Sequence, residues 1–325
     1  MVNGKPTVIS LFAGCGGSSL GYKWAGYHEL LAIEWDKNAV ETFKLNFPDV
    51  PCWQRDIREV AGQEIMDFCG LEPGGLDLLD ASPPCQGFST AGKRKVTDPR
   101  NDLFLEFVRL VKELQPKVFV MENVSGLVKG KMKGRFIEIM QTLKGLPYHV
   151  RCRKMNAMFY GVPQSRERLI WIGAKDGEPE FPEPNGKTIP FGKIMETGKE
   201  DDLDKINRER WTHIPQGGNF SNLPKRLQTK ARYSNTYRKL STRKPAYTLL
   251  KHDHFSGAFF HPTESRYITI TEKKRIASFP DEFMFTGDNK EITARIGNAV
   301  TPRLMEAIAT TIRQQMFDKS AQNEQ

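Results

Sequence analysis

The sequence predicts an α/β protein in which helices cover both faces of a mostly parallel sheet. Three observations lead to this prediction. Strand-like and helix-like segments alternate through the first half of the 325-residue chain. The strand candidates are short and almost continuously apolar, which is typical of strands buried on both faces. After residue 173 the periodicity fades while Pro, Gly and charged residues become frequent, so a second, irregular domain is expected.

The expected elements follow one another along the chain. Strands are expected over residues 7–12, 29–35, 75–81, 117–123, near 148–156 and over 168–174. Helices are expected within 21–27, over 36–47, over 101–114 and near 134–144. The helix over 101–114 has the strongest pattern, with four apolar residues at helical spacing: Leu103, Phe107, Leu110 and Leu114. A helical pattern returns over 271–279 and near the end of the chain, where the residues in register are Leu304, Ile308 and Ile312.

Positive charge is concentrated in one segment. The chain has 48 Lys and Arg against 39 Asp and Glu, a formal net charge of +9. Residues 211–252 contain nine of these basic residues and no acidic residue, with tyrosines between them. A long run of one sign with interleaved aromatic residues indicates a surface for a polyanion. Nucleic acid is favoured over an anionic membrane, because no amphipathic helical stripe accompanies the charges.

Composition also excludes several classes of protein. No apolar run approaches the ~20 residues that a membrane helix needs, and the N-terminal segment lacks the layout of a signal peptide. A cytoplasmic protein without a membrane partner is therefore expected. The five cysteines are scattered and form no CxxC pair, so neither a disulfide framework nor a metal site is expected.

A glycine-rich segment follows the first expected strand. The stretch "SLFAGCGGSSLGY" places Gly14, Gly16 and Gly17 where a strand turns into a helix, which lets a nucleotide approach the backbone. A dinucleotide-dependent oxidoreductase would have a third glycine at the position of Ser19. Glu34 follows Gly14 by twenty residues, a spacing that suits a carboxylate on ribose hydroxyls. The alternative for Glu34 is a surface carboxylate at a strand end.

Two other residues near this segment have two interpretations each. Trp35 is either a ring that stacks on an adenine or a tryptophan of the core. Asp56 either caps the start of a helix or accepts hydrogen bonds from the exocyclic amine of an adenine. The sequence alone leaves both pairs of interpretations open.

A thiol and a carboxylate each follow an expected strand. Cys85 lies in "DASPPCQGFST", directly after Pro84, which fixes φ and removes a backbone donor. Glu122 lies in "MENV", and a carboxylate at the carboxyl end of a parallel strand faces the ligand crevice. A thiolate and a carboxylic acid in one crevice can act as nucleophile and proton donor. The alternative for Cys85 is a small residue in a proline-rich loop.

Together these motifs resemble those of the cytosine-5 DNA methyltransferases of bacteria and phages, over nearly the whole chain. "FAGCGG" is similar to the methyl-donor loop of that family, "PPCQ" to its nucleophile loop and "ENV" to its acid motif. "QSRERL" (164–169) is similar to its arginine motif and "RIGNAV" (295–300) to its closing motif. The resemblance implies a Rossmann-like fold that binds S-adenosylmethionine, and a DNA (cytosine-5-)-methyltransferase activity of the restriction–modification kind.

The resemblance implies roles for segments and for single residues. Residues 1–180 are expected to form the catalytic, S-adenosylmethionine-binding domain, 181–284 the target-recognition domain, and 285–325 a return to the catalytic domain. Cys85 is expected to add to C6 of a flipped cytosine while Glu122 protonates N3, with Asn123 as a brace for Glu122. Arg166 and Arg168 are expected to hold the base carbonyl and the catalytic loop, with a structural salt bridge as the alternative for Arg166.

The binding residues that the resemblance implies form two groups. The donor site is expected to contain Phe12, Gly14, Gly16, Glu34, Trp35, Asp56, Ile57, Leu103, Asn298 and Ala299. Phosphate and base contacts are expected from a mobile loop after Cys85 and from the basic segment, through Gln86, Ser89, Lys93, Arg94, Arg232, Arg238 and Arg243. The expected partner is double-stranded DNA, bound by a monomer.

Two rival functions share some of these features. A tRNA cytosine methyltransferase would have the same type of nucleophile loop, but the Cys-Phe-Thr signature of that branch is missing, since no cysteine follows Cys152. A non-catalytic DNA-binding protein would tolerate the loss of Cys85 or Glu122, and both are present. No nuclease motif is visible, so a cognate restriction endonuclease would be a separate chain.

Overall fold

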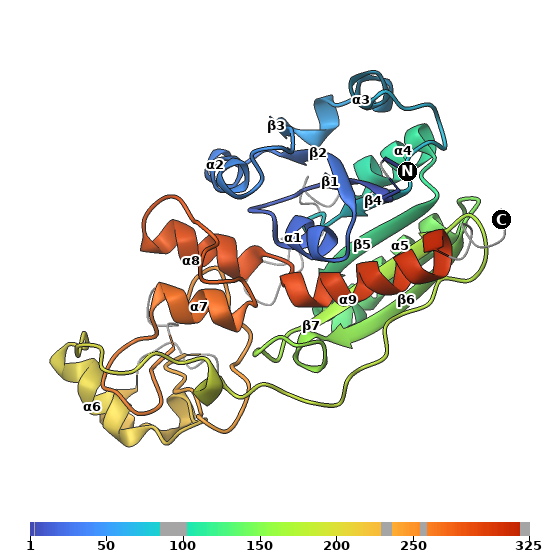
Figure 1. Cartoon of the computed structure of the whole chain (residues 1–325). Helices are drawn as coiled ribbons and strands as arrows, with labels where there is room; N and C mark the ends of the chain where they lie inside the picture. Colours follow the sequence, from blue (N-terminus) through green and yellow to red (C-terminus); the bar gives the residue numbers. More distant parts are fainter. Residues whose placement is uncertain (3, 85–102, 229–235, 254–258, 319–325) are drawn as a thin grey trace. The chain divides into compact units, whose positions relative to one another are not determined.

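A computed structural model describes residues 1–2, 4–84, 103–228, 236–253 and 259–318 (Figure 1). Its chain packs into two compact units. The sheet unit comprises Met1–Asn156, Glu167–Glu183 and Pro302–Gln325, and the irregular unit comprises Ala157–Arg166 and Pro184–Thr301. These units are defined by packing, whereas the ranges 1–180, 181–284 and 285–325 are defined by function, so the functional division stays a prediction.

A seven-stranded sheet forms the centre of the sheet unit. Its strands lie in the order β3-β2-β1-β4-β5-β7-β6. Neighbouring strands from β3 to β5 pair in parallel, while β7 runs antiparallel to both β5 and β6. The prediction of a mostly parallel sheet is confirmed. The strand bounds are β1 (Thr7–Leu11), β2 (His28–Glu34), β3 (Cys52–Gln54), β4 (Leu78–Ala81), β5 (Val118–Val124), β6 (His149–Asn156) and β7 (Glu167–Ala174).

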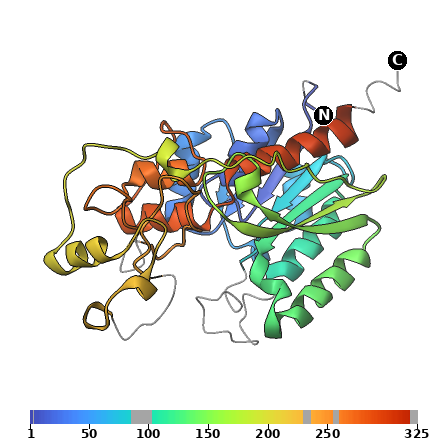
Figure 2. The ribbon, with the colours of Figure 1, turned by 90° about the horizontal axis from the view of Figure 1, so that it is seen from below.

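Helices cover both faces of this sheet (Figures 1 and 2). One face packs against α4 and α5, with α3 beside α4, and alternate strand residues such as Ile9, Leu79 and Phe119 contribute to that core. The other face carries α1 and α9, which lie side by side. The helix bounds are α1 (Gly17–Trp24), α2 (Lys37–Asn46), α3 (Gly62–Cys69), α4 (Leu103–Leu114), α5 (Lys133–Lys144) and α9 (Pro302–Ile312).

Local sequence accounts for several of these elements. Helix α2 begins after Asp36, whose carboxylate accepts a hydrogen bond from the backbone N–H of Ala39 over 3.0 Å. The predicted apolar stripe of α4 is buried, and Phe107 packs edge-on against Phe119 of β5. At Gly21 of α1 a Cβ would lie 2.7 Å from the Cβ of Met305 in α9, so the close approach of these two helices requires glycine.

Several elements were not expected from the sequence, among them one strand and two helices. Strand β3 has only three residues, and helices α3 and α6 (Lys205–His213) are short. A three-residue strand gives too few positions for an alternating pattern, and it forms because it pairs with β2. Helix α6 has almost no apolar stripe, and its sequence "KINRERWTH" is typical of a solvated segment.

Few regular elements occur in the described part of the irregular unit. Besides α6 it contains α7 (Ile270–Ile276) and α8 (Asn289–Asn298), and each of these two helices starts with a capping box. A small core forms around Phe220, Tyr237 and Phe260, and the rings of Tyr237 and Phe260 are stacked. Within the described residues, no helix is both long enough and apolar enough to cross a membrane.

Candidate active site

The loop between β1 and α1 has an unusual backbone. Phe12, Gly14 and Gly16 have φ angles of 56°, 57° and 94°, and a positive φ is strained for a residue such as Phe12. At Gly16 a Cβ would lie 2.4 Å from the ring of Phe47, so only glycine fits there. At Gly14 a Cβ would meet nothing within 4 Å, so the backbone faces open space. A ligand can therefore approach the loop closely at Gly14.

Glu34, at the end of β2, holds this loop in place. Its carboxylate accepts hydrogen bonds from the backbone N–H groups of Gly14, Trp35 and Asp36, each over 2.9 Å. Burial raises the pKa of Glu34, while these N–H groups act against the rise. Glu34 is only 9 % exposed, so the interpretation as a surface carboxylate is wrong. A carboxylate has about four acceptor positions, which leaves capacity for a ligand hydroxyl beside the three N–H groups.

Trp35 and Asp56 lie at the ends of the two outer parallel strands. Trp35 is 72 % exposed, so it is not a core tryptophan, and its ring is available for stacking. Asp56 caps the 3-10 helix η1 (Ile57–Glu59) by accepting from the backbone N–H of Arg58 over 3.0 Å. The side chain of Arg58 also hydrogen-bonds Asp56 and lowers the pKa of that carboxyl. The interpretation of Asp56 as a helix cap is therefore confirmed, and its side chain remains partly exposed.

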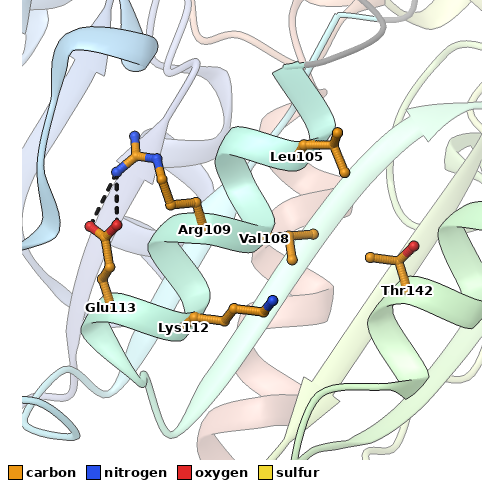
Figure 3. Close-up of a pocket in the computed structure, with 6 residues that line it drawn as sticks. All are labelled: Leu105, Val108, Arg109, Lys112, Glu113 and Thr142. Carbon is orange, nitrogen blue, oxygen red and sulfur yellow. Dashed lines mark hydrogen bonds and ion pairs between the residues drawn. The ribbon is translucent and has the colours of Figure 1, made fainter.

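Arg109 on α4 fixes the position of η1. Its Nη2 donates to the carbonyl oxygens of Ile57, over 3.1 Å, and Val60, over 2.9 Å. Its Nη1 pairs with Glu113 (Figure 3), and Oε2 of Glu113 accepts from the backbone N–H of Gly62 over 2.6 Å. The turn that carries Asp56 and Ile57 is thus attached to α4 by one guanidinium. No sequence motif pointed to Arg109, because a helix-surface arginine has no distinctive spacing.

A hollow of about 410 Å³ lies beside this arginine on α4 and α5 (Figure 3). Leu105, Val108, Arg109, Lys112, Glu113 and Thr142 line it. None of the expected site residues that the structure describes is among them. The candidate site is instead the edge of the sheet where β1, β2, β3 and β5 end.

Glu122 and Asn123 lie near the end of β5 at this edge. Arg168 of β7 places its Nε 2.5 Å from Oε1 of Glu122, and both side chains are largely buried. The Nδ2 group of Asn123 donates to the carbonyl oxygen of Pro83 over 3.2 Å, while its Oδ1 accepts from the N–H of Val124. Asn123 therefore connects β5, the strand that carries Glu122, to the segment that leads to Cys85. Cys85 itself lies outside the described residues.

Three of the four described cysteines are poor candidates for the nucleophile. The four are Cys15, Cys52, Cys69 and Cys152, and none of them forms a disulfide. Burial raises the pKa of Cys52 and Cys152 to about 12 and that of Cys69 to about 11, so these three stay protonated at neutral pH.

Arg166 has a structural environment within the irregular unit. Its Nη1 donates to the carbonyl oxygen of Leu249 over 3.1 Å, and its Nη2 donates to those of Gly297 and Ala299, each over 3.0 Å. The alternative expected for Arg166 was a structural salt bridge. The structure supports a structural role, but the hydrogen bonds that Arg166 donates here go to backbone carbonyl groups. Asn298 and Ala299 are in the same unit, at the end of α8. Leu103 starts α4 in the sheet unit and packs against the core.

The expected base contact of Arg238 is not supported. Its side chain is 8 % exposed, and its Nη2 lies 3.3 Å from Oδ2 of Asp253. The guanidinium also lies over the ring of Phe259, 4.3 Å from its centroid. Because the guanidinium of Arg238 is engaged by these two neighbours, we no longer expect it to contact a DNA base. Arg243 is exposed, while the remaining expected DNA contacts lie outside the described residues: Gln86, Ser89, Lys93, Arg94 and Arg232.

One buried polar pair was missed by the sequence reasoning. Tyr22 of α1 donates from its hydroxyl to Oδ1 of Asp80 in β4 over 3.1 Å. Burial raises the pKa of Asp80 to about 7. The pair connects the helix after the glycine-rich loop to the strand that precedes Cys85.

Comparisons with known proteins agree with this arrangement. The family model for C-5 cytosine-specific DNA methylases matches residues 6–314. The chain is similar to the Type II methyltransferase M1.HphI of Haemophilus parahaemolyticus, with 36 % identity over 94 % of this chain and 86 % of that protein. It is also similar to the Type II methyltransferase M.XorII of Xanthomonas oryzae pv. oryzae, with 32 % identity over 97 % and 86 % of the two chains.

A solved structure shares the fold. It is the crystal structure of a prophage-encoded protein of E. coli assigned as a DNA modification methyltransferase. The two chains are 25 % identical and superpose with a TM-score of 0.76, over 95 % of this chain and 99 % of that one. The match includes the Rossmann-like sheet, so the expected fold class is confirmed.

Proposed function

The chain belongs to the C-5 cytosine-specific DNA methylase family, and we propose that it methylates a flipped cytosine in a specific duplex DNA sequence through a covalent adduct of Cys85. The enzyme class, a DNA (cytosine-5-)-methyltransferase, follows from the family and from the Type II methyltransferases that it resembles. The observation that carries the mechanism is the ion pair of Glu122 and Arg168 on a strand tied through Asn123 to Pro83, two residues before Cys85.

The residues around the glycine-rich loop fit S-adenosylmethionine. Open space at Gly14 admits a ligand next to the backbone, and Glu34 has acceptor capacity for ribose hydroxyls. The exposed ring of Trp35 suits stacking, and the partly exposed carboxylate of Asp56 suits an exocyclic amine. When bound, S-adenosylmethionine supplies an electrophilic methyl group at this edge of the sheet.

The proposed reaction needs a nucleophile and an acid because cytosine is a poor nucleophile at C5. The Cys85 thiolate forms a bond to C6, and the electron pair of the C5–C6 double bond makes C5 nucleophilic. Glu122 delivers a proton to N3, which prevents negative charge from accumulating on the ring. After C5 has gained its methyl group, a base removes the C5 proton, the double bond re-forms, the thiolate leaves and the N3 proton returns to Glu122. Arg168 holds Oε1 of Glu122 so that the carboxyl group keeps its orientation.

The proposed reaction also requires that the target cytosine be accessible to Cys85. A cytosine inside a duplex is out of reach, so it must leave the stack at a cost of a few kcal/mol. The loop after Cys85 and the basic segment 211–252 are proposed to hold the DNA while the base is extruded. We also propose a monomer that works in the cytoplasm. A separate restriction endonuclease would be the partner that makes methylation protective, as the Type II names of the relatives suggest.

A plasmid assay tests this function. The purified chain is incubated with S-adenosylmethionine and a plasmid of mixed sequence, and modified cytosines are mapped by bisulfite sequencing. Methylation at one recurring sequence is expected. Cys85→Ser is expected to abolish transfer while duplex binding persists, because the thiolate acts only in the chemical step. Glu122→Gln is expected to slow transfer strongly at unchanged donor affinity.

The same assay separates the rival functions. Methylation of a tRNA transcript in preference to the plasmid would favour the RNA-modifying alternative. Substantial turnover by Cys85→Ser would remove the nucleophile assignment and leave only the enzyme class.

A further inference from the structure

Two exposed lysines, Lys154 and Lys129, act on Glu167 at the start of β7. Lys154 of β6 places its Nζ 2.9 Å from Oε1 of Glu167. The hydrogen bond from Lys154, strengthened by its charge and by that of Lys129, holds the pKa of Glu167 below its usual range. Both lysines are exposed, so their charges face solvent.

These lysines lie at the edge of the sheet that carries the proposed acid. Glu167 directly precedes Arg168, which pairs with Glu122. Lys154 lies near the end of β6, where it is in register with Leu169 of β7. Lys129 follows the 3-10 helix η3 (Ser125–Val128), which begins where β5 ends. The positive charges therefore lie at the same edge of the sheet as the Glu122–Arg168 pair, although Glu167 and Arg168, as consecutive residues of β7, point to opposite faces.

Positive charge continues along the chain from Lys129. The stretch "KGKMKGR" (129–135) contains four basic residues and no acidic residue. Lys133, the first residue of α5, is exposed. Stability gives little reason for this arrangement, because exposed ion pairs contribute only about 0–1 kcal/mol, and a lysine at the start of a helix opposes the helix dipole.

We propose that Lys129, Lys133 and Lys154 form a phosphate-binding surface, the acid-side basic surface, that holds the DNA backbone next to the target cytosine. The proposal rests on the proposed function, since that function puts DNA at this edge of the sheet. It differs from the basic segment 211–252, which belongs to the irregular unit. Lysine suits the role because its ammonium group binds a phosphate as a point charge without geometric selectivity.

The proposal predicts a specific change in salt dependence. Each phosphate contact adds about 0.9 to the steepness of log K against log[salt] for duplex DNA. Lys129→Gln combined with Lys133→Gln is expected to reduce the slope by about 1–2 and to weaken cognate and random duplexes by the same factor. Lys129→Glu with Lys133→Glu is expected to weaken both duplexes further. Lys154→Gln alone is expected to reduce the slope by about 1 or less, since Lys154 also pairs with Glu167.

Lys144→Gln is the matched control. It is exposed, lies on the same helix as Lys133 and is about 16 Å from it along the axis, at a rise of about 1.5 Å per residue. Its slope and affinity are expected to equal those of the wild type. Donor binding, measured by calorimetry, and the unfolding midpoint are expected to be unchanged in all variants.

Several results would overturn the proposal. They are a wild-type slope in both double variants, a loss confined to the cognate duplex, or an equal loss in Lys144→Gln. Failure of the proposed function is a separate outcome, because it would appear as a wild-type chain that methylates no plasmid. A chain that methylates the plasmid while the lysine variants bind normally would refute only the acid-side basic surface.

Discussion

The side-chain amide of Asn123 donates a hydrogen bond to the carbonyl oxygen of Pro83, 3.2 Å away. Glu122 is the neighbour of Asn123 in β5, and Cys85 follows Pro83 by two residues. One amide group therefore ties the proposed acid to the segment that carries the proposed nucleophile. Pro84, between Pro83 and Cys85, adds stiffness because its ring fixes φ.

Replacing Asn123 by Ala should slow catalysis without affecting the donor site. The Pro83 carbonyl would lose its partner, and an unpaired buried group costs about 1–3 kcal/mol. If this cost falls on the transition state, the single-turnover methylation rate should drop roughly 5- to 150-fold. Asn123→Asp, which keeps the acceptor for Val124 but loses the donor, should show a similar loss. A rate within about twofold of the wild type in both variants would disprove the coupling.

Glu34→Ala should weaken the binding of S-adenosylmethionine. The substitution frees three backbone N–H groups and removes the acceptor proposed for the ribose. A loss of about 1–3 kcal/mol corresponds to a rise in Kd of roughly 5- to 150-fold in titration calorimetry. Glu41→Ala is the control, because Glu41 lies on the exposed side of α2. Equal affinities for the two variants would remove Glu34 from the donor site.

Arg109→Ala should raise the KM for S-adenosylmethionine about tenfold and leave kcat nearly unchanged. Arg109 holds the carbonyl groups of Ile57 and Val60, so its loss should loosen η1 without disturbing the reacting base. Arg109→Lys should raise the KM less than Arg109→Ala does, because a lysine can still donate to one of these carbonyl groups. Lys112→Ala, on the same helix, should behave like the wild type. A fall in kcat at constant KM would show that Arg109 acts elsewhere.

The contribution of Asp80 to the stability of the protein should fall as the pH rises from about 4 to 7. Burial raises the pKa of Asp80 to about 7, whereas an unfolded Asp titrates near 3.9. Within this window the folded state keeps a proton that the unfolded state releases, so the free energy of unfolding decreases with pH.

Asp80→Asn should remove this contribution. The difference in the free energy of unfolding between pH 5 and pH 8, measured by urea denaturation, should shrink by up to about 2–3 kcal/mol. Part of the pH dependence should remain, because burial also raises the pKa of Glu29 to about 7. An unchanged difference between the two pH values would mean that Asp80 is ionised in the folded protein throughout.

Much of the fold could be predicted because its signals are local. The helical spacing of Phe107 and Leu110 marks α4, and continuous apolar runs mark the strands of the sheet. The spacing from Gly14 to Glu34 predicted a carboxylate near the glycine-rich loop, and the hydrogen bond between them confirms that they meet.

Other features depend on tertiary contacts that leave no local pattern. Strand β3 forms because its three residues pair with the edge of β2. The positive charge of Arg238 suggested a DNA contact, but Asp253 and Phe259 surround it in the fold. Charge alone does not distinguish an arginine that faces a partner from one that is buried among its own neighbours.

The contact between α1 and α9 has a consequence for biosynthesis. Helix α1 leaves the ribosome early, whereas Met305, which packs against Gly21, is translated about 280 residues later. At about 5–20 residues per second, the nascent chain must wait roughly a quarter of a minute to a minute for that partner. During this time the side of α1 that packs against α9 stays uncovered. The packing of α1 is therefore completed only after α9 has been translated.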